Sequence, residues 1–373
     1  MEKSVERSSL QGRIPSIDLF KIVSMLMVVV LHSNNFGGIL YNAAPNSALR
    51  VISTALEVVC IVAVNCFALT SGFLNGDRKV RIKNIINLYL QVLFFSLLFF
   101  FVFCLCGKEE FSLNGLFLYS TPVTSSIYWY FTSYFILFLF MPLLNTVIER
   151  AEKKTVCITL SVLAVIFGIV SYVASFHAGD VFNLKNGYSA LWLIYLYLVG
   201  GAIKKYGFSF SIKGRKIPAY IYLLLFFLSC LLNVLFGLLI RIDSSYPPMI
   251  FEYNFILNFI SSLALLLFFA NLKVKEFKII TFFARTSFGV YLIHEHPYVR
   301  KHIIQNSLFP LLKINPLLAL LGIIGFVLAV YLICTAIEYI RQVLFSLAKV
   351  NKLTVFIDKK LSGITSKNEK HLE

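Results

Sequence analysis

Long apolar runs recur along the whole chain, and they restrict the folds it can adopt more than any other feature. Several runs of eighteen or more residues carry few or no charges, which is the length an α-helix needs to cross a bilayer. Of the 373 residues, 58% are hydrophobic and only 14% are charged, whereas a soluble domain carries about a quarter charged residues. The sequence therefore predicts an all-α protein that spans a membrane many times.

The apolar runs divide into ten predicted transmembrane helices. Their limits are residues 15–35, 50–75, 84–107, 127–148, 155–175, 188–204, 217–240, 251–271, 279–297 and 315–345. The first run is followed by the polar sequence HSNN rather than by a small-residue cleavage motif, so we expect an uncleaved span. Residues 1–350 then form one transmembrane domain, and residues 351–373 form a basic cytoplasmic tail.

The net charge of +16 would suit a nucleic-acid partner in a soluble protein, but its distribution indicates another origin. Most of the 34 Lys and Arg residues fall in the N-terminal segment, in the tail and in alternate loops such as DRKVRIK and KGRK. Loops rich in Lys and Arg stay in the cytoplasm. The pattern predicts that both termini are cytoplasmic. It also supports the count of ten spans, because dropping or adding one span would break the alternation.

Cysteine and histidine spacing gives no sign of a metal site. All seven cysteines lie in apolar segments without the spacing of zinc ligands, so we interpret them as buried apolar residues. His294 and His296 flank Glu295 in the run YLIHEHPYVR, but side chains two residues apart on a helix do not face each other. The sequence therefore predicts no bound metal.

The first apolar run, SIDLFKIVSMLMVVVLH, places ionisable residues at unusual positions. Lys21 and His32 are eleven residues apart, which is close to three helical turns and a rise of roughly 16 Å, so they share one face. Asp18 lies within about 40° of His32 in projection and can also pair with Lys21 at i, i+3. Ionisable residues within a span usually face a cavity, and the spacing predicts a polar passage along this helix. The alternative is that Lys21 snorkels to one interface while His32 lies among outer headgroups.

These positions resemble the (Arg/Lys)-x10-His pattern on the first helix of the membrane acyltransferase-3 family, whose members are O-acyltransferases of surface polysaccharides. NCFALTSGFLNGDRKVRIKN is similar to that family's SG-containing helix end and its Arg-x-x-Arg loop, and YWYFTSYFILFLFMPLLN resembles its fourth span. LWLIYLYLVGGAIKKY and TSFGVYLIH are similar to its sixth and ninth spans. The resemblance covers nearly the whole chain in order. It implies a multi-pass protein of the bacterial cell (cytoplasmic) membrane.

The implied reaction moves an acetyl or other short acyl group from acyl-CoA to a sugar hydroxyl. An imidazole is suited to removing the hydroxyl proton, so His32 is the expected catalytic base, oriented by a neighbour such as Asp18. A covalent acyl-histidine remains an alternative. Lys21 completes the expected catalytic group.

Acetyl-CoA, as the cytoplasmic donor, carries phosphates that need cations near the inner end of the spans. Arg78 and Arg81 are the expected phosphate ligands, because a guanidinium can hold a phosphate with two hydrogen bonds. The small residues Ser71 and Gly72 would let the pantetheine chain approach, or would serve only helix packing.

Three further residues are candidates for binding the acceptor, which would be a glycan and could be lipid-linked. His294 matches the terminal histidine of the family's ninth span, with an acceptor-binding or a structural role. Glu57 either faces the passage or pairs with Arg50. Trp129 either belongs to an interfacial aromatic belt or stacks on a sugar ring.

Two other functions fit a polytopic chain of this composition. A polysaccharide-precursor transporter or flippase would show inverted repeats and broken spans at matching positions, which are not evident here. A polysaccharide polymerase would carry a large outer loop, whereas the predicted outer loops are short. The residues leave open the acceptor sugar, the hydroxyl position, the oligomeric state and the need for a separate partner protein.

Overall fold

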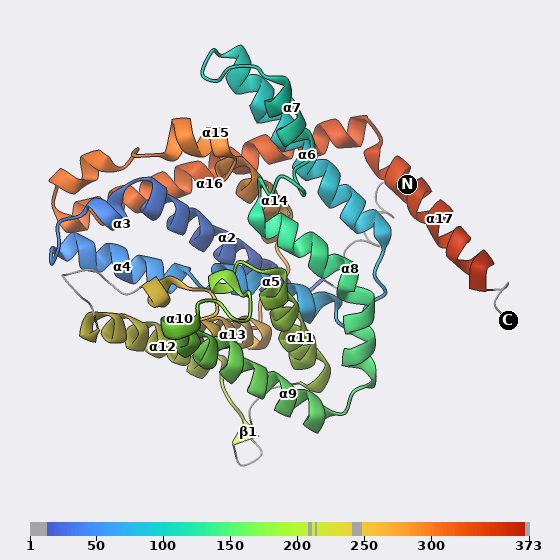
Figure 1. Cartoon of the computed structure of the whole chain (residues 1–373), viewed down its shortest axis with the longest axis horizontal. Coiled ribbons are helices and arrows are strands. Elements are labelled where there is room, and N and C mark those ends of the chain that lie inside the picture. The colour runs from blue at the N-terminus through green and yellow to red at the C-terminus, as the bar shows by residue number, and fades with distance from the viewer. Residues whose placement is uncertain (1–12, 208–210, 213–214, 241–247, 370–373) are drawn as a thin grey trace.

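The computed structural model describes residues 13–207, 211–212, 215–240 and 248–369 and is almost entirely helical (Figure 1). Its longer helices are α2 (Pro15–Phe36), α4 (Ala48–Cys60), α5 (Ala63–Asn75), α6 (Ile82–Leu105), α8 (Trp129–Arg150), α9 (Lys153–Val165), α11 (Ala190–Tyr206), α12 (Ala219–Leu239), α13 (Ile256–Asn271), α14 (Lys278–His294), α16 (Pro316–Leu347) and α17 (Val350–Glu369). Shorter helices are α3 (Ile39–Asn42), α7 (Leu113–Ser120), η1 (Ile166–Val170), α10 (Ser171–Ala178), η2 (Lys185–Gly187), η3 (Pro248–Phe251), α15 (Pro297–Val299), η4 (Arg300–Ile304) and η5 (Phe309–Lys313). The two-residue strands β1 (Ser211–Ile212) and β2 (Arg215–Lys216) pair as an antiparallel hairpin.

Eight helical segments of the described residues are long and apolar enough to cross a membrane. They are Pro15–Phe36, Ala48–Asn75, Ile82–Leu105, Trp129–Arg150, Lys153–Ala178, Ala219–Leu239, Pro248–Asn271 and Pro316–Leu347. The remaining two predicted spans correspond to α11 and α14, which have 17 residues each, the lower end of the length that spans a bilayer. The all-α membrane fold is thus confirmed, and the helix limits lie within a few residues of those predicted.

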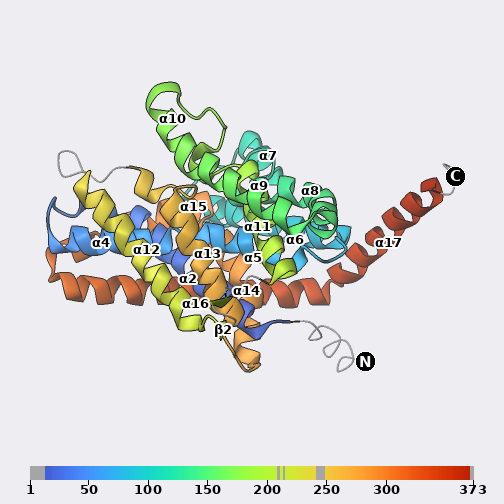
Figure 2. The ribbon, with the colours of Figure 1, turned by 90° about the horizontal axis from the view of Figure 1, so that it is seen from below.

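Helix α2 runs through the middle of the bundle (Figures 1 and 2) and packs against α4, α5, α13, α14 and α16. Because it is surrounded, α2 has no single apolar face, and small polar side chains such as Ser24 and Asn34 are as buried as Phe20 and Val29. Phe20 stacks on Phe269 of α13 with a ring-centroid distance of 4.9 Å. This central position gives every residue of the first span a protein neighbour.

Helices α5 and α11 approach each other closely at two glycines. A Cβ atom on Gly72 would lie 1.9 Å from the carbonyl oxygen of Tyr197, and a Cβ on Gly200 would lie 2.1 Å from that of Leu69. Two backbones can approach this closely only where glycine removes the side chain. We call this contact the glycine seam (Gly72 and Gly200 with the facing carbonyls).

The periphery of the bundle carries large apolar side chains on its outer surface. Helix α12 exposes Leu224, Leu231 and Leu235, and α16 exposes Leu321, Leu328 and Leu332. A water-soluble protein rarely leaves so much contiguous apolar surface uncovered. These faces are suited to contact with lipid tails.

The predicted tail after residue 350 contains α17, which leaves the end of α16 and points away from the bundle (Figure 2). It packs against α6. There the Asp358 carboxylate accepts a hydrogen bond of 3.2 Å from the backbone N–H of Lys83, in the first turn of α6. A carboxylate at a helix N-terminus satisfies one of its unpaired donors.

Candidate active site

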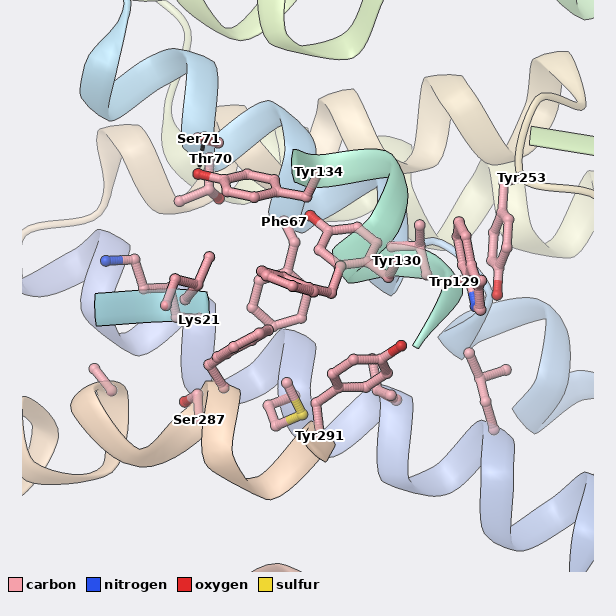
Figure 3. Close-up of a pocket in the computed structure, with 18 of the residues that line it drawn as sticks. Lys21, Phe67, Thr70, Ser71, Trp129, Tyr130, Tyr134, Tyr253, Ser287 and Tyr291 are labelled. Carbon is pink, nitrogen blue, oxygen red and sulfur yellow. Dashed lines mark hydrogen bonds between the residues drawn. The ribbon is translucent and has the colours of Figure 1, made fainter. Parts of the chain in front are cut away.

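A cavity of about 280 Å³ lies between α2, α5, α8 and α14. In Figure 3, Lys21 lies at one end and Trp129 and Tyr253 at the other, with Tyr130, Tyr134 and Tyr291 between them. Lys21 and His32 both line this cavity, so the shared face predicted from their spacing is turned toward a common passage. Most of the remaining wall is aromatic and aliphatic.

The Lys21 end of the cavity contains a chain of charged side chains. The Lys21 Nζ lies 3.4 Å from Asp18 Oδ1, and Arg13 approaches Asp18 Oδ2 at 2.7 Å through NH2 and at 2.8 Å through Nε. The expected Asp18–Lys21 pair is therefore present. Asp18 does not orient His32, however, because fourteen residues of helix separate them by roughly 21 Å. Similar angular position on a helix places two side chains on one face without bringing them together.

His32 is instead held by residues of the α14 end. The Nδ1 atom of His294 lies 2.5 Å from the carbonyl oxygen of Val290, which can only accept, so this nitrogen carries the hydrogen. The Nε2 atom of a neutral His294 is then an acceptor, and it lies 2.9 Å from Nδ1 of His32. The His32 Nδ1 therefore donates, and its Nε2 keeps the lone pair.

The carboxylate of Glu295 also lies beside Nδ1 of His32. Its Oε2 lies 3.1 Å from Nδ1 of His32, and its Oε1 accepts a 2.7 Å hydrogen bond from NH1 of Arg300. The Arg300 guanidinium also lies over the ring of Phe36, 4.7 Å from its centroid. Sequence reasoning considered Glu295 only as a metal ligand and did not single out Arg300. The available signal was their position in YLIHEHPYVR, directly after the predicted ninth span.

His294 is 1% exposed and does not line the cavity. Of the two roles considered for His294, its position behind His32 fits the structural one. His296 points elsewhere, with its Nε2 3.3 Å from the carbonyl oxygen of Ser96. Within the described part of the chain, no group of three His, Cys, Asp or Glu side chains is arranged to hold a metal ion.

Glu57 neither faces the cavity nor pairs with Arg50. It is buried, and its Oε2 accepts a 2.7 Å hydrogen bond from Nδ2 of Asn34. The same amide also donates to the backbone of Ser53, whose hydroxyl donates back to Asn34 at 2.7 Å. Arg50 donates to the carbonyl oxygen of Leu40. Glu57 thus ties α4 to α2 two residues beyond His32.

Ser71 and Gly72 are adjacent but face different neighbours. Ser71 lines the cavity, and its Oγ lies 3.1 Å from the hydroxyl of Tyr134 on α8. Gly72 forms part of the glycine seam with α11 and does not contact the cavity. Of the two roles considered for it, the structure assigns Gly72 to helix packing.

A second, basic cavity of about 780 Å³ lies beyond the Lys21 end, between the loop after α5 and the facing ends of α8 and α11. Arg78, Lys79 and Lys204 line it together with Asp77 and Glu149. Arg81 does not: it is the residue that precedes the first turn of α6. Lys205 also lines this cavity, but its Nζ donates to the last carbonyls of α8, at 2.6 Å to Ile148 and 2.7 Å to Glu149.

The two cavities are separated by a pair of asparagines. Asn75 lines the first cavity and Asn145 the second. Asn145 Nδ2 donates to the carbonyls of Asn75 at 2.8 Å and Arg78 at 2.9 Å, while its Oδ1 accepts from the Tyr197 hydroxyl at 2.7 Å. A thin polar layer therefore lies between the basic cavity and the passage that leads to His32.

Trp129 begins α8 and lines the end of the first cavity opposite Lys21 (Figure 3). Its ring stacks on Tyr253 with a centroid distance of 5.7 Å and an interplanar angle of 19°, and it also contacts Tyr188 at 4.4 Å. It therefore belongs to an aromatic cluster at the cavity end.

The comparison with known families agrees with this architecture. The acyltransferase-3 family model, described as an acyltransferase domain, matches residues 14–338. No curated protein and no solved structure matches the chain. The matched segment begins just before α2 and ends within α16, so it includes both cavities and the residues around His32. The chain therefore belongs to the acyltransferase-3 family of membrane acyltransferases.

Proposed function

We propose that this protein transfers an acetyl or similar short acyl group from cytoplasmic acyl-CoA to a hydroxyl of a surface glycan. The observation that carries the proposal is that Lys21 and His32 line one cavity, with His32 held by His294 and Glu295 at its inner wall. A cation near one membrane surface and an imidazole roughly 16 Å deeper suit a donor that enters from one side and an acceptor that arrives from the other.

The hydrogen-bond chain behind His32 supports its role as the base. Because Nδ1 donates, the Nε2 lone pair is available to take the proton of the acceptor hydroxyl as its oxygen attacks the thioester carbonyl. The imidazolium that forms would be stabilised by the Glu295 carboxylate 3.1 Å from Nδ1. The thiolate of CoA then leaves and takes up the proton from His32. Attack by Nε2 on the thioester, to give an acyl-histidine, uses the same tautomer.

The basic cavity supports the assignment of the donor side. Arg78, Lys79 and Lys204 would hold the phosphates of CoA, and the pantetheine arm would pass the Asn75–Asn145 layer to reach Ser71 and Lys21. Under the positive-inside rule this end faces the cytoplasm, with both termini on that side. We place the protein in the cytoplasmic membrane of a bacterial cell, with the acceptor at the outer leaflet.

The test uses the purified full-length protein in lipid nanodiscs with acetyl-CoA labelled in the acetyl group. The acceptor is the surface glycan of the host, stripped of its esters by mild alkali. We expect label in the glycan as an alkali-labile ester, and none with His32→Ala. A protein that neither consumes acetyl-CoA nor labels the glycan, but whose deletion prevents display of the glycan at the surface, would instead be a transporter of glycan precursors.

A further inference from the structure

Three aromatic rings form a cluster at the end of the first cavity, and we call it the aromatic platform (Trp129, Tyr188 and Tyr253). Trp129 and Tyr253 are stacked, and Tyr188 is tilted against both. Trp129 starts α8, Tyr188 follows η2, and Tyr253 precedes α13, so the rings come from three separate connections. Tyr188 lies 4.7 Å from Tyr253 and 4.4 Å from Trp129, while Trp129 and Tyr253 are nearly parallel. The predicted topology places all three connections on the outer side of the membrane.

The backbone around Tyr253 is fixed from both sides. Its N–H donates to the carbonyl oxygen of Asn186 at 3.0 Å, and its carbonyl accepts from Nδ2 of Asn65 at 2.8 Å. The Oδ1 of Asn65 accepts in turn from the indole of Trp192 at 2.9 Å. A Cβ on Gly187, which has φ +88°, would lie 2.5 Å from the Cβ of Tyr253. The site of Tyr253 is therefore preorganised rather than filled by loose packing.

The loop that carries Tyr188 holds an uncommon backbone. Asn183, Lys185 and Asn186 all have positive φ values of 50–56°, and Asp180 accepts hydrogen bonds from the N–H groups of Leu184 and Lys185. Such conformations cost free energy and persist where the surrounding structure demands them, often at ligand-binding sites. Here the positive-φ backbone of the loop places Tyr188 against Trp129 and Tyr253.

The platform is continuous with the reaction site and with the surface. Trp129 and Tyr253 line the same cavity as His32, while 43% of Tyr188 is exposed. Residues of an interfacial aromatic belt would instead be distributed around the bundle with their rings toward lipid. Trp129 and Tyr253, whose nearly parallel rings border the cavity that contains His32, offer an apolar surface on which a ligand can be oriented.

We propose that the aromatic platform binds one pyranose ring of the acceptor by its C–H face and so presents a hydroxyl of that glycan toward His32. This inference rests on the proposed function and adds to it that the acceptor is recognised through a ring rather than through charge. The electron-rich faces of Trp and Tyr attract the weakly positive C–H face of a sugar, which an open-chain polyol does not offer.

The experiment is saturation-transfer NMR on the purified protein in nanodiscs, without acyl-CoA. The probes are methyl glycosides of glucose, galactose, mannose and N-acetylglucosamine, with sorbitol as a polyol that has hydroxyls but no ring. Trp129→Ala and Tyr188→Ala test the platform, and Trp129→Phe tests whether an aromatic face suffices. Phe176→Ala removes another exposed aromatic ring, on α10 and outside the cavity, as the matched control.

We expect saturation of ring C–H protons in at least one glycoside, none in sorbitol, at least a tenfold loss of affinity in both alanine variants, and retention in Trp129→Phe and Phe176→Ala. Glycoside binding that survives both alanine substitutions would overturn the proposal, as would the absence of binding by every glycoside.

Steady-state kinetics separate a failure of the platform proposal from a failure of the proposed function. The alanine variants should raise the KM for the glycan acceptor by a larger factor than the KM for acyl-CoA, and Phe176→Ala should leave both KM values unchanged. Failure of all acyl transfer would count against the proposed function, whereas the NMR result would still decide the platform.

Discussion

His32 Nδ1 and His294 Nε2 lie 2.9 Å apart, although 262 residues separate them in the chain. This contact joins the outer part of α2 to the last residue of α14, and the Val290 carbonyl behind His294 determines which ring nitrogen carries the hydrogen. The orientation of the proposed base is therefore set by a different helix from the one that carries it.

Replacing His32 should slow the reaction strongly without disturbing the bundle. We expect His32→Ala to lower the rate of acyl transfer by about 10²–10⁴-fold, because the acceptor hydroxyl loses its base. The measurement is transfer of labelled acetyl to the glycan, with thermal unfolding in detergent as a check of folding. His177→Ala, at an exposed histidine on α10, is the matched control and should keep full activity. An active His32→Ala enzyme would exclude both the base and the acyl-histidine.

Glu295→Gln keeps the shape of the side chain and removes its charge. We expect kcat to fall by roughly 10- to 100-fold with little change in either KM, because the carboxylate 3.1 Å from Nδ1 attracts the positive charge on His32, which exists only after proton transfer. Steady-state kinetics with both substrates provide the measurement. An equal rise in the KM values with unchanged kcat would indicate that Glu295 shapes the cavity instead.

Arg78 and Arg81 are equivalent candidates in the sequence, but their substitution should affect the KM for acetyl-CoA differently. Arg78→Ala should raise the KM for acetyl-CoA by roughly tenfold or more, because a charge-assisted hydrogen bond to phosphate is lost. Arg81→Ala should have a much smaller effect, since Arg81 does not line the basic cavity. The KM for the acceptor should change in neither variant. Equal effects of the two substitutions would contradict the assignment of the basic cavity to CoA.

The glycine seam gives a prediction about stability. A Cβ in Gly72→Ala would lie 1.9 Å from the Tyr197 carbonyl oxygen, so α5 and α11 must separate at a cost of about 1–3 kcal/mol. We expect a lower unfolding temperature and reduced activity. Gly325→Ala is the matched control, because no atom lies within 4 Å of its added Cβ and alanine favours a helix by about 1 kcal/mol. A Gly72→Ala protein as stable as the control would refute the close packing of these helices.

The helices were predictable because a bilayer imposes length and composition on every span. The limits of α2, predicted as 15–35 and found as Pro15–Phe36, follow from the apolar run alone. The shared cavity of Lys21 and His32 was also predictable, since eleven residues return a helix to nearly the same face.

The partners of those residues were not predictable, because helical periodicity says nothing about which helices become neighbours. Asp18 had the right angular position to be linked with His32, yet the neighbour proved to be Glu295, at the end of another helix. The same limit applies to Gly72, which sits next to the cavity-lining Ser71 but is turned toward α11. The sequence shows that a residue has a small side chain, but it does not show whether the space beside that residue is filled by a ligand or by the backbone of another helix.

The glycine seam also restricts the route by which an acyl donor can enter the passage to His32. Two helices whose backbones touch cannot part without losing that contact, so α5, which lines the passage, keeps a fixed spacing to α11 behind it. Helix α8 is joined to the same pair: its Asn145 donates to the carbonyls of Asn75, at the end of α5, and of Arg78 after it, and accepts from the Tyr197 hydroxyl of α11. An acyl donor that reaches His32 from the basic cavity would therefore pass along a wall of helices that are joined to one another, and not between two helices that part.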